Sequence, residues 1–321
     1  MIINNIRSES SGPLLVKHRG KRLLWGLMLL LSVIIYGSHG PLITLCKVDG
    51  TVPFRSSSVV LLIEASKLVL SFVFMLIWDR DSFQAPWSWH LAAPFALPAL
   101  LYGVNNNLVV LIQQFMDPST YQVLSNLKIS TTAVLYSIFL HQRLTLRKWF
   151  ALFLLTVAGV CYAYGGLQDH QDPAANMQPY ITLPGFGMVF IYCLISGLSA
   201  VYTELILKTQ NVPLNVQNLF LYSFGIVLNL GANVAYSPGA GFFDGFSFWV
   251  LVIIASQALN GLIMSLVLKH SSNIARLFII SSSLLVNGLL SFLLFGLQLT
   301  GLFFLAILLI SLSVYLYYGI K

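Results

Sequence analysis

The chain has 321 residues, of which 57% are hydrophobic and only 8% are charged. Soluble domains carry roughly 25% charged residues. This chain has about a third of that share, and its mean hydropathy is +0.83. The composition excludes a soluble enzyme, a disordered chain and a disulfide scaffold, and it predicts an all-α polytopic membrane protein. The net charge of +7 would also suit a nucleic-acid binder. The basic residues gather at the ends of apolar runs, however, which indicates membrane topology and no nucleic-acid partner.

Ten apolar runs follow one another, each about long enough for a helix to cross a bilayer. A polar, basic tail over residues 1–22 precedes them, and we expect it to lie in the cytosol before an uncleaved first span. Residues 319–321 would form a short cytosolic C-terminus. The expected spans are 23–46, 58–78, 92–114, 119–140, 147–166, 184–207, 216–236, 248–268, 276–296 and 299–318.

The distribution of Lys and Arg supports this topology. Of the 17 basic residues, only Lys47 and Arg55 fall in loops on one side of the membrane. Lys67 and Lys128 lie inside spans, and the other thirteen fall on the opposite side. Because positively charged loops stay in the cytosol, we expect both termini to be cytosolic.

A polar interruption at Gln168–Pro179 leaves five spans before it and five after it. Since five is odd, the second half enters the membrane in the opposite sense, as in inverted-topology repeats, which hold substrate near the midplane. We therefore expect a first five-helix repeat over 23–166, a polar inter-repeat loop over 167–183 and a second repeat over 184–318. This expectation rests on the span count, because the two halves show no convincing residue-level identity.

Lys128 is a charged residue near the middle of the fourth expected span. A charge at the bilayer centre costs roughly 2.5–3.5 kcal/mol on insertion scales, so it faces a cavity or a counterion. Tyr121 lies seven positions earlier, which would place both residues on one face of a continuous helix. Glu64 and Glu204 are the only acidic residues well placed to pair with this lysine. We favour an anion site, with Lys128 as a point charge for phosphate, over a buried ion pair.

Two further polar groups lie in the second and third expected spans. Glu64 and Lys67 are three positions apart, so we expect a mutually neutralised pair that packs the bundle, with a gating role as the alternative. Asn105–Asn107 are three consecutive amides, which point in different directions from a helix. Interhelical hydrogen bonds would explain one or two of them, and recognition of a base or sugar is the alternative for the rest.

The second half offers two weaker signals. Asn218 and Tyr222 are four positions apart and share a helix face. Arg276 opens the ninth expected span. Its position favours an interfacial anchor, and the alternative is a second cation that binds phosphate through bidentate contacts.

Other kinds of chemistry lack a signature. The six His residues are scattered without metal-ligand spacing, and we find no P-loop, GxSxG or GxGxxG motif and no paired intramembrane carboxylates. We expect Cys46, Cys161 and Cys193 to be inert packing thiols. The sequence therefore predicts no catalytic residue, no metal and no cofactor.

The stretches Tyr102–Asn107, Tyr121–Val123 and Leu127–Ile129 resemble the nucleotide-sugar transporter family. More narrowly, they are similar to the branch that carries CMP-sialic acid, UDP-galactose and UDP-N-acetylglucosamine. The similarity covers nearly everything from about residue 25 to 318 and includes Tyr202–Lys208, Gln217–Asn218 and Phe295–Thr300.

This resemblance implies a ten-helix bundle of two inverted five-helix repeats, the drug/metabolite transporter fold. It also implies a multi-pass antiporter of the Golgi apparatus membrane with both termini cytosolic. The implied exchange is of a cytosolic pyrimidine nucleotide sugar or polyol for a lumenal nucleoside monophosphate. The cargo would be UDP-, CMP- or CDP-linked, with CDP-ribitol as one candidate.

The resemblance also assigns substrate-binding residues. Lys128 corresponds to a phosphate-contacting lysine and Tyr121 to a tyrosine that lines the nucleotide pocket. The other matching positions are Asn106 and Asn107 on the third span and Asn218 and Tyr222 on the seventh.

At two positions the chain departs from the CMP-sialic acid carrier. Arg276 stands where that carrier has a lysine, which keeps the charge but changes its geometry. Phe224 stands where it has a nucleotide-contacting serine. The anion site is therefore expected to be retained, while the preference for base or sugar differs.

Two alternatives come from other functional classes. One is a carrier of the same fold for another organic anion, and the other is a transport-inactive membrane scaffold that regulates other Golgi carriers. Besides the lipid bilayer, the expected partners are the nucleotide sugar and the nucleoside monophosphate. Assembly with itself or with related transporters stays open.

Overall fold

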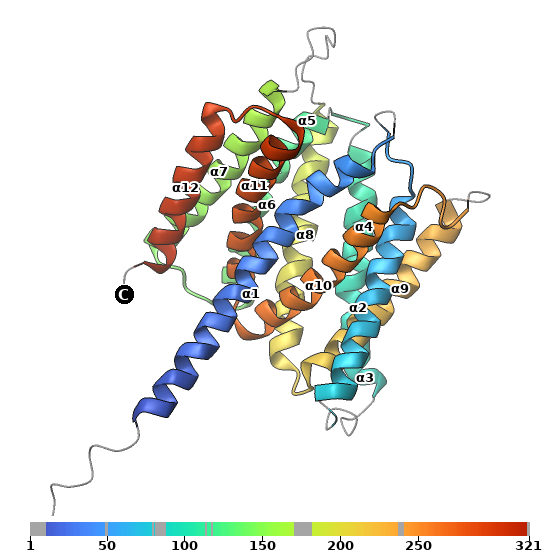
Figure 1. The fold of residues 1–321 in the computed structure, drawn as a ribbon, viewed down its shortest axis with the longest axis vertical. Coiled ribbons are helices and arrows are strands. Elements are labelled where there is room, and N and C mark those ends of the chain that lie inside the picture. The colour runs from blue at the N-terminus through green and yellow to red at the C-terminus, as the bar shows by residue number, and fades with distance from the viewer. Residues whose placement is uncertain are drawn as a thin grey trace, which may run out of the picture.

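The computed structural model describes residues 11–48, 51–78, 80, 88–112, 114–116, 118–169, 182–236 and 241–319. Its regular elements are helices (Figure 1). They are α1 (Ser11–Cys46), α2 (Ser56–Trp78), α3 (Trp89–Ala92), the short 3-10 helix η2 (Ala93–Phe95), α4 (Ala96–Ile112), α5 (Pro118–Ser125), α6 (Lys128–Phe139), α7 (Leu146–Asp169), α8 (Leu183–Thr209), α9 (Leu214–Tyr236), α10 (Phe248–His270), α11 (Asn273–Phe295) and α12 (Gly301–Tyr318).

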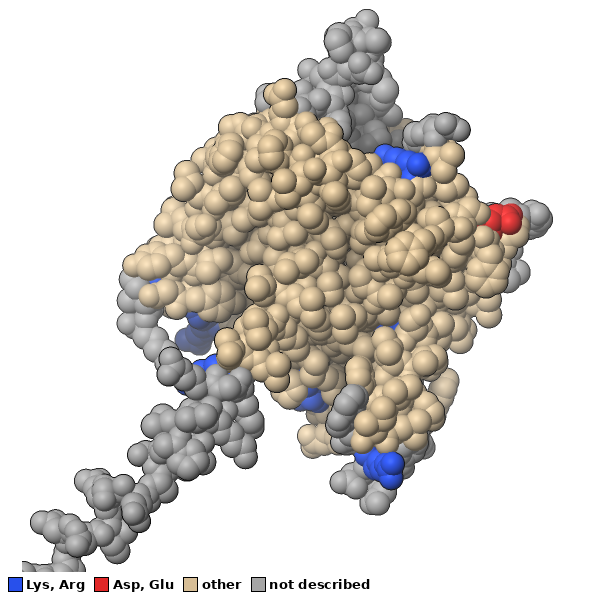
Figure 2. Space-filling view, viewed as in Figure 1, with Lys and Arg blue, Asp and Glu red and all other residues tan. Residues whose placement is uncertain are grey.

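Each of the ten expected spans overlaps at least one helix, which confirms an all-α polytopic architecture. Within the described residues, seven helices are long and apolar enough to cross a membrane: α1, α2, α7, α8, α10, α11 and α12. On the face drawn in Figure 2, charged side chains lie near the edges and the broad middle is almost free of them. Helices suit this setting because each one satisfies its own backbone hydrogen bonds in lipid.

The fourth expected span needs a correction. The sequence predicts one helix over 119–140, whereas α5 and α6 are separate helices. The amide of Asn126 donates to the carbonyl of Gln122 at 2.9 Å, and in a continuous helix that carbonyl would accept the backbone N–H four residues on. The backbone N–H of Asn126 instead reaches back only three residues, at 3.3 Å. Lys128 therefore opens a new helix, so the prediction of one continuous helix through Tyr121 and Lys128 is wrong, although both residues lie toward α8, near Tyr192 and Cys193.

Polar side chains and glycine define several helix ends. The Thr182 hydroxyl accepts from the N–H of Gly185 at 3.2 Å and donates to the Phe115 carbonyl at 2.9 Å, which ties the start of α8 to the segment after α4. The hydroxyl of Ser272 caps α11 by accepting from the N–H of Ala275 at 3.2 Å. Gly296 ends α11 in the left-handed region.

The helices pack across the two halves of the chain. The principal contacts of α1 are with α10 and α11, and those of α8 are with α4 and α6. In the same way, α2 lies against α9 and α10, α9 also lies against α4, and α7 lies against α12.

Two close helix contacts depend on glycine. An added Cβ at Gly37 of α1 would lie 2.5 Å from Val286 of α11, and one at Gly197 of α8 would lie 2.9 Å from Leu135 of α6.

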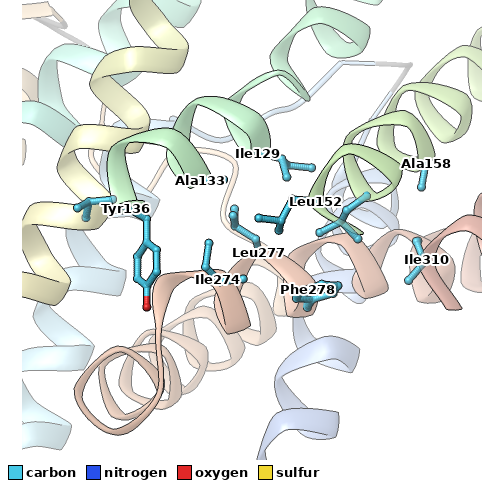
Figure 3. Packing of buried hydrophobic residues seen from close by; sticks show 11 residues of the cluster. Ile129, Ala133, Tyr136, Leu152, Ala158, Ile274, Leu277, Phe278 and Ile310 are labelled. Carbon is cyan, nitrogen blue, oxygen red and sulfur yellow. The ribbon is translucent and has the colours of Figure 1, made fainter. Parts of the chain in front are cut away.

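The largest buried apolar cluster joins α6, α7, α8, α11 and α12 (Figure 3). Its buried members are Ile129, Ala133, Tyr136, Leu152, Leu155, Ala158, Val201, Ile274, Leu277, Phe278 and Ile310. Because these residues come from both halves, the cluster holds the halves together on one side of the bundle. The helices α2 and α9 lie toward the other side in Figure 1.

Some expectations fall on parts of the chain that the structure does not describe. The basic tail is described from residue 11 onward and only for its backbone as far as residue 21. Most of the inter-repeat loop, residues 170–181, lies outside the described residues, as do residues 320 and 321.

Candidate functional site

A cavity of about 450 Å³ lies among α1, α2, α4, α8, α9, α10 and α11. This volume falls within the roughly 300–1,000 Å³ typical of small-molecule sites. Both halves of the chain supply its walls, and the walls carry charged and polar groups inside an otherwise apolar bundle. Among the predicted site residues, Asn106, Tyr222 and Arg276 line this cavity together.

Arg276 is the cation of this cavity that has no carboxylate beside it. Its Nη1 donates to the hydroxyl of Tyr102 at 3.3 Å, and the hydroxyl of Tyr36 lies close to the same guanidinium. Its Nε is buried without an acceptor. Across the described part of the chain, no Asp or Glu lies within ion-pair distance of this arginine. A guanidinium held by neutral hydroxyls keeps its charge available for an anion.

Glu64 and Lys67 form the expected ion pair, with Nζ 2.5 Å from the carboxylate. The pairing is confirmed, but the pair lines the cavity, which a purely packing role does not require. The ammonium also lies 4.6 Å from the ring centroid of Tyr222, a cation–π distance.

Two glycines make room for this ion pair. A Cβ at Gly225 of α9 would lie 2.9 Å from the Glu64 carboxylate, and a Cβ at Gly261 of α10 would lie 2.5 Å from Cδ of Lys67. The pair is therefore seated between α9 and α10 only because both facing positions lack a side chain.

Asn218 and Tyr222 use one face of α9 to bond α10, as their spacing predicts. The amide of Asn218 donates to the hydroxyl of Ser265 at 3.1 Å, and the hydroxyl of Tyr222 contacts the carbonyl of Gly261 at 3.5 Å. Tyr222 lines the cavity, whereas Asn218 is buried behind Ser265 and has an Oδ1 without a partner.

Lys128 and Tyr121 are not among the residues that line the cavity. Lys128, at the start of α6, lies beside Cys193 of α8. The Tyr121 ring meets the ring of Tyr192 edge to face, with centroids 5.6 Å apart. The phosphate role of Lys128 stays a prediction.

The two carboxylates considered as partners of Lys128 have other partners. Glu64 pairs with Lys67, and the fully buried Glu204 pairs with Lys208 at 2.6 Å.

The polar triplet on α4 is divided. Asn106 lines the cavity, and Asn105 is buried with an Oδ1 that has no partner. The side chain of Asn107 lies outside the described residues. Phe224, the other position that departs from the CMP-sialic acid carrier, turns its ring toward Trp89 of α3 at 6.0 Å and does not line the cavity.

Several cavity residues escape the sequence-based reasoning. Tyr36 and His39 on α1 line the cavity, as do Gln257 and Asn260 on α10. Each pair is three positions apart in an otherwise apolar span, so that spacing could have indicated a polar helix face. Within the described ranges, no group of three or more His, Cys, Asp or Glu residues could hold a metal ion.

Comparison with known proteins adds the evolutionary context. A family profile described as "Nucleotide-sugar transporter" matches residues 43–318. The chain is 65% identical over 317 residues to the "Probable UDP-sugar transporter protein SLC35A4" of Xenopus tropicalis, with 99% of each chain covered. It is 55% identical to the protein of the same name from Homo sapiens, with 94% of this chain and 96% of that protein covered.

A solved structure, titled only "Crystal structure of protein", shares the overall fold. Its TM-score is 0.69, at 11% sequence identity, with 91% of this chain and 96% of that chain covered.

Proposed function

The chain belongs to the nucleotide-sugar transporter family, so it is a multi-pass membrane transporter and not an enzyme, and from this premise we propose that it is an antiporter of the Golgi membrane. It exchanges a cytosolic pyrimidine nucleotide sugar or polyol for a lumenal nucleoside monophosphate. The name of its relatives supports a UDP-linked cargo, and CMP- and CDP-linked cargoes, including CDP-ribitol, are the other candidates. The observation that carries the proposal is Arg276, a part-buried guanidinium that lines the cavity without a carboxylate.

In this proposal the phosphate groups of the cargo bind Arg276. An empty carrier would keep this cation in the bundle with only tyrosine hydroxyls beside it, and a buried charge without its counterion is costly to move. Crossing the membrane empty is then disfavoured, and exchange follows. Lys128 is proposed as a second phosphate contact, reached when the joint between α5 and α6 changes conformation.

Packing supports the further proposal of two inverted five-helix repeats. Exchanging the halves maps α1 on α8, α2 on α9, α4 on α10, α6 on α11 and α7 on α12. Under this exchange the contact between α1 and α11 corresponds to the contact between α8 and α6. The contact between α1 and α10 corresponds to the contact between α8 and α4. All four contacts occur in the structure. The glycines at the close approaches also correspond, because Gly37 lies in the contact between α1 and α11 and Gly197 in the contact between α8 and α6. Alternating access would then rock one repeat against the other.

The end of the bundle that we propose to be cytosolic is held together by two lysines. Nζ of Lys208 on α8 donates to the carbonyl of Ser271 between α10 and α11 at 2.5 Å. In return, Nζ of Lys269 on α10 donates to the carbonyl of Leu207 on α8. Both contacts lie within the second proposed repeat, so they tie α8 to α10 and to the start of α11 as one unit at this end of the bundle.

The test uses purified protein in liposomes preloaded with CMP or UMP. Labelled CMP-, CDP- and UDP-linked sugars and polyols are supplied outside. We expect uptake that depends on one internal nucleotide, that is lost in Arg276→Ala and Lys128→Ala, and that persists in Arg143→Ala. Arg143 is a matched control because it is exposed in the segment between α6 and α7.

Two outcomes would contradict parts of the proposal. No uptake of any compound by folded protein would refute transport of these nucleotides and favour the scaffold or the carrier of another organic anion. Normal exchange by Lys128→Ala would remove Lys128 from the mechanism and leave Arg276 in place.

A further inference from the structure

The cavity contains buried polar atoms that lack a hydrogen-bond partner. Nδ1 of His39 and Nε2 of Gln257 have none within the described part of the chain, and both residues line the cavity. Buried polar groups in proteins are almost always paired, so an unpaired group in a cavity wall indicates a ligand or water that completes it.

The two groups lie on one wall, where α1 and α10 run antiparallel. Two apolar clusters set the direction. The middle of α1 meets the second half of α10 in one, and the end of α1 meets the start of α10 in the other. The hydroxyl of Ser32, in the part of α1 that forms the first of these clusters, donates to the amide oxygen of Asn260, which lies between the two clusters on α10, at 2.5 Å. Along the two helices, His39 and Gln257 both lie between that bond and the cluster that holds Ile43 and Ile253. They therefore stand at a similar level of the helix pair.

This wall adjoins the cation of the cavity. Tyr36, whose hydroxyl lies beside the Arg276 guanidinium, is three residues before His39 on the same face of α1. Three residues of an α-helix rise about 4.5 Å. A phosphate at Arg276 thus leaves the next part of a cargo molecule within reach of the wall.

The chemistry of the wall fits hydroxyl groups. A primary amide offers two N–H donors, and an imidazole nitrogen donates or accepts according to its tautomer, whereas a hydroxyl does both. Along the described lining, the Lys and Arg side chains are Lys67, which is paired, and Arg276. No further cation therefore stands at His39 and Gln257 to bind a carboxylate.

We propose that His39 and Gln257 form a hydroxyl-recognising subsite that holds the neutral polyhydroxyl part of the cargo, a sugar or a polyol, while its phosphate lies at Arg276. This inference rests on the proposed transport function and names residues that determine its specificity. The unpaired atoms of the empty wall become hydrogen-bonded when the cargo enters. A site built to bond hydroxyls discriminates against cargo that lacks them.

The test separates two kinds of exchange in proteoliposomes. The first is nucleoside monophosphate for nucleoside monophosphate, with CMP and UMP as probes, which needs only the phosphate and nucleoside contacts. The second is uptake of CMP-, CDP- and UDP-linked sugars and polyols. The variants are His39→Leu and Gln257→Met, which keep bulk and remove hydrogen bonding, and His39→Asn, which keeps a polar atom near the position of Nδ1. Gln142→Met, in the exposed segment after α6, is the matched control.

We expect the KM for the sugar- or polyol-linked cargo to rise about tenfold in His39→Leu and in Gln257→Met. Monophosphate exchange should stay within about twofold of wild type in both, as should every reaction in Gln142→Met. His39→Asn should recover most of the loss. Binding of CMP or UMP, followed as a thermal shift of the purified variants, checks that the rest of the site is intact.

Each other outcome counts against the proposal. If His39→Leu and Gln257→Met are active with an unchanged KM for the sugar- or polyol-linked cargo, the proposed subsite is wrong and the proposed transport function is unaffected. Equal losses in both kinds of exchange also overturn it, because the residues would then serve the nucleotide or the fold. A folded wild-type protein that exchanges none of the probes overturns the transport function and the subsite together.

Discussion

Glu204 allows a quantitative prediction, because its side chain is fully buried and both of its oxygens are engaged. One oxygen accepts from Nζ of Lys208 at 2.6 Å, and the other accepts from the backbone N–H of Asn273, the first residue of α11, at 2.6 Å. The carboxylate thus joins the end of α8 to the start of α11. Its negative charge also suits the helix N-terminus. We predict that removing either side-chain charge destabilises the protein, and by different amounts.

The magnitude follows from the burial of each partner. Glu204→Gln keeps an acceptor for the Asn273 N–H and loses charge-assisted hydrogen bonds, so it should cost about 1.5–3 kcal/mol. Lys208 is 32% exposed and keeps its hydrogen bond to the Ser271 carbonyl when the carboxylate is gone, which favours the lower end of this range. Lys208→Met leaves the carboxylate buried with only a backbone donor, and it should cost about 3–5 kcal/mol.

The assay is SDS-induced unfolding of the purified protein in mixed micelles, applied to both single variants and to the double variant. The double variant removes both charges, so its cost should fall short of the sum of the single costs by about 1–3 kcal/mol. Arg143→Met, an exposed position between α6 and α7, serves as the neutral control. Additive costs, or a stable Lys208→Met protein, would refute the reasoning.

Three further predictions concern helix ends and the charged pair. Gly296→Ala should destabilise by about 1–2 kcal/mol in the same unfolding assay, because the residue has a φ of +68° and an added Cβ would meet open space, so only the backbone is strained. Ser272→Ala should cost about 1 kcal/mol, measured the same way, because it removes the acceptor that caps the N–H of Ala275; an unchanged midpoint would count against the cap. Gly261→Ala places a Cβ 2.5 Å from Cδ of Lys67, so it should raise the KM of exchange in proteoliposomes while the protein stays folded, and normal kinetics would show that the position of the pair is unimportant.

The membrane-spanning architecture follows from the sequence alone. Long apolar runs in lipid must satisfy their own backbone hydrogen bonds, so their composition and length predict membrane-spanning helices. Pairing at short range is predictable for a similar reason. Glu64 and Lys67, or Asn218 and Tyr222, lie within one helical turn, and the geometry of one helix decides that they share a face.

The break between α5 and α6 shows where such reasoning ends. The side-chain amide of Asn126 donates to the carbonyl of Gln122 in its own helix. Whether such an amide bonds its own helix or a neighbouring helix depends on which helix packs against it. Here that neighbour is α7, where Gly159 leaves space for the side chain. The sequence supports a polar face through Lys128, and the fold places that lysine beside α8 and not in the cavity.

The sequence by itself determined the all-α membrane class of the protein, its family resemblance and its local pairs, because these depend on composition and on residues close in the chain. Only the tertiary structure decided which polar groups meet. Tyr36, Tyr102 and Arg276 come from three helices far apart in sequence and gather around one cation. His39 and Gln257 form the proposed subsite only because α1 lies antiparallel to α10. Such long-range neighbours follow from helix packing, which no local pattern of residues encodes.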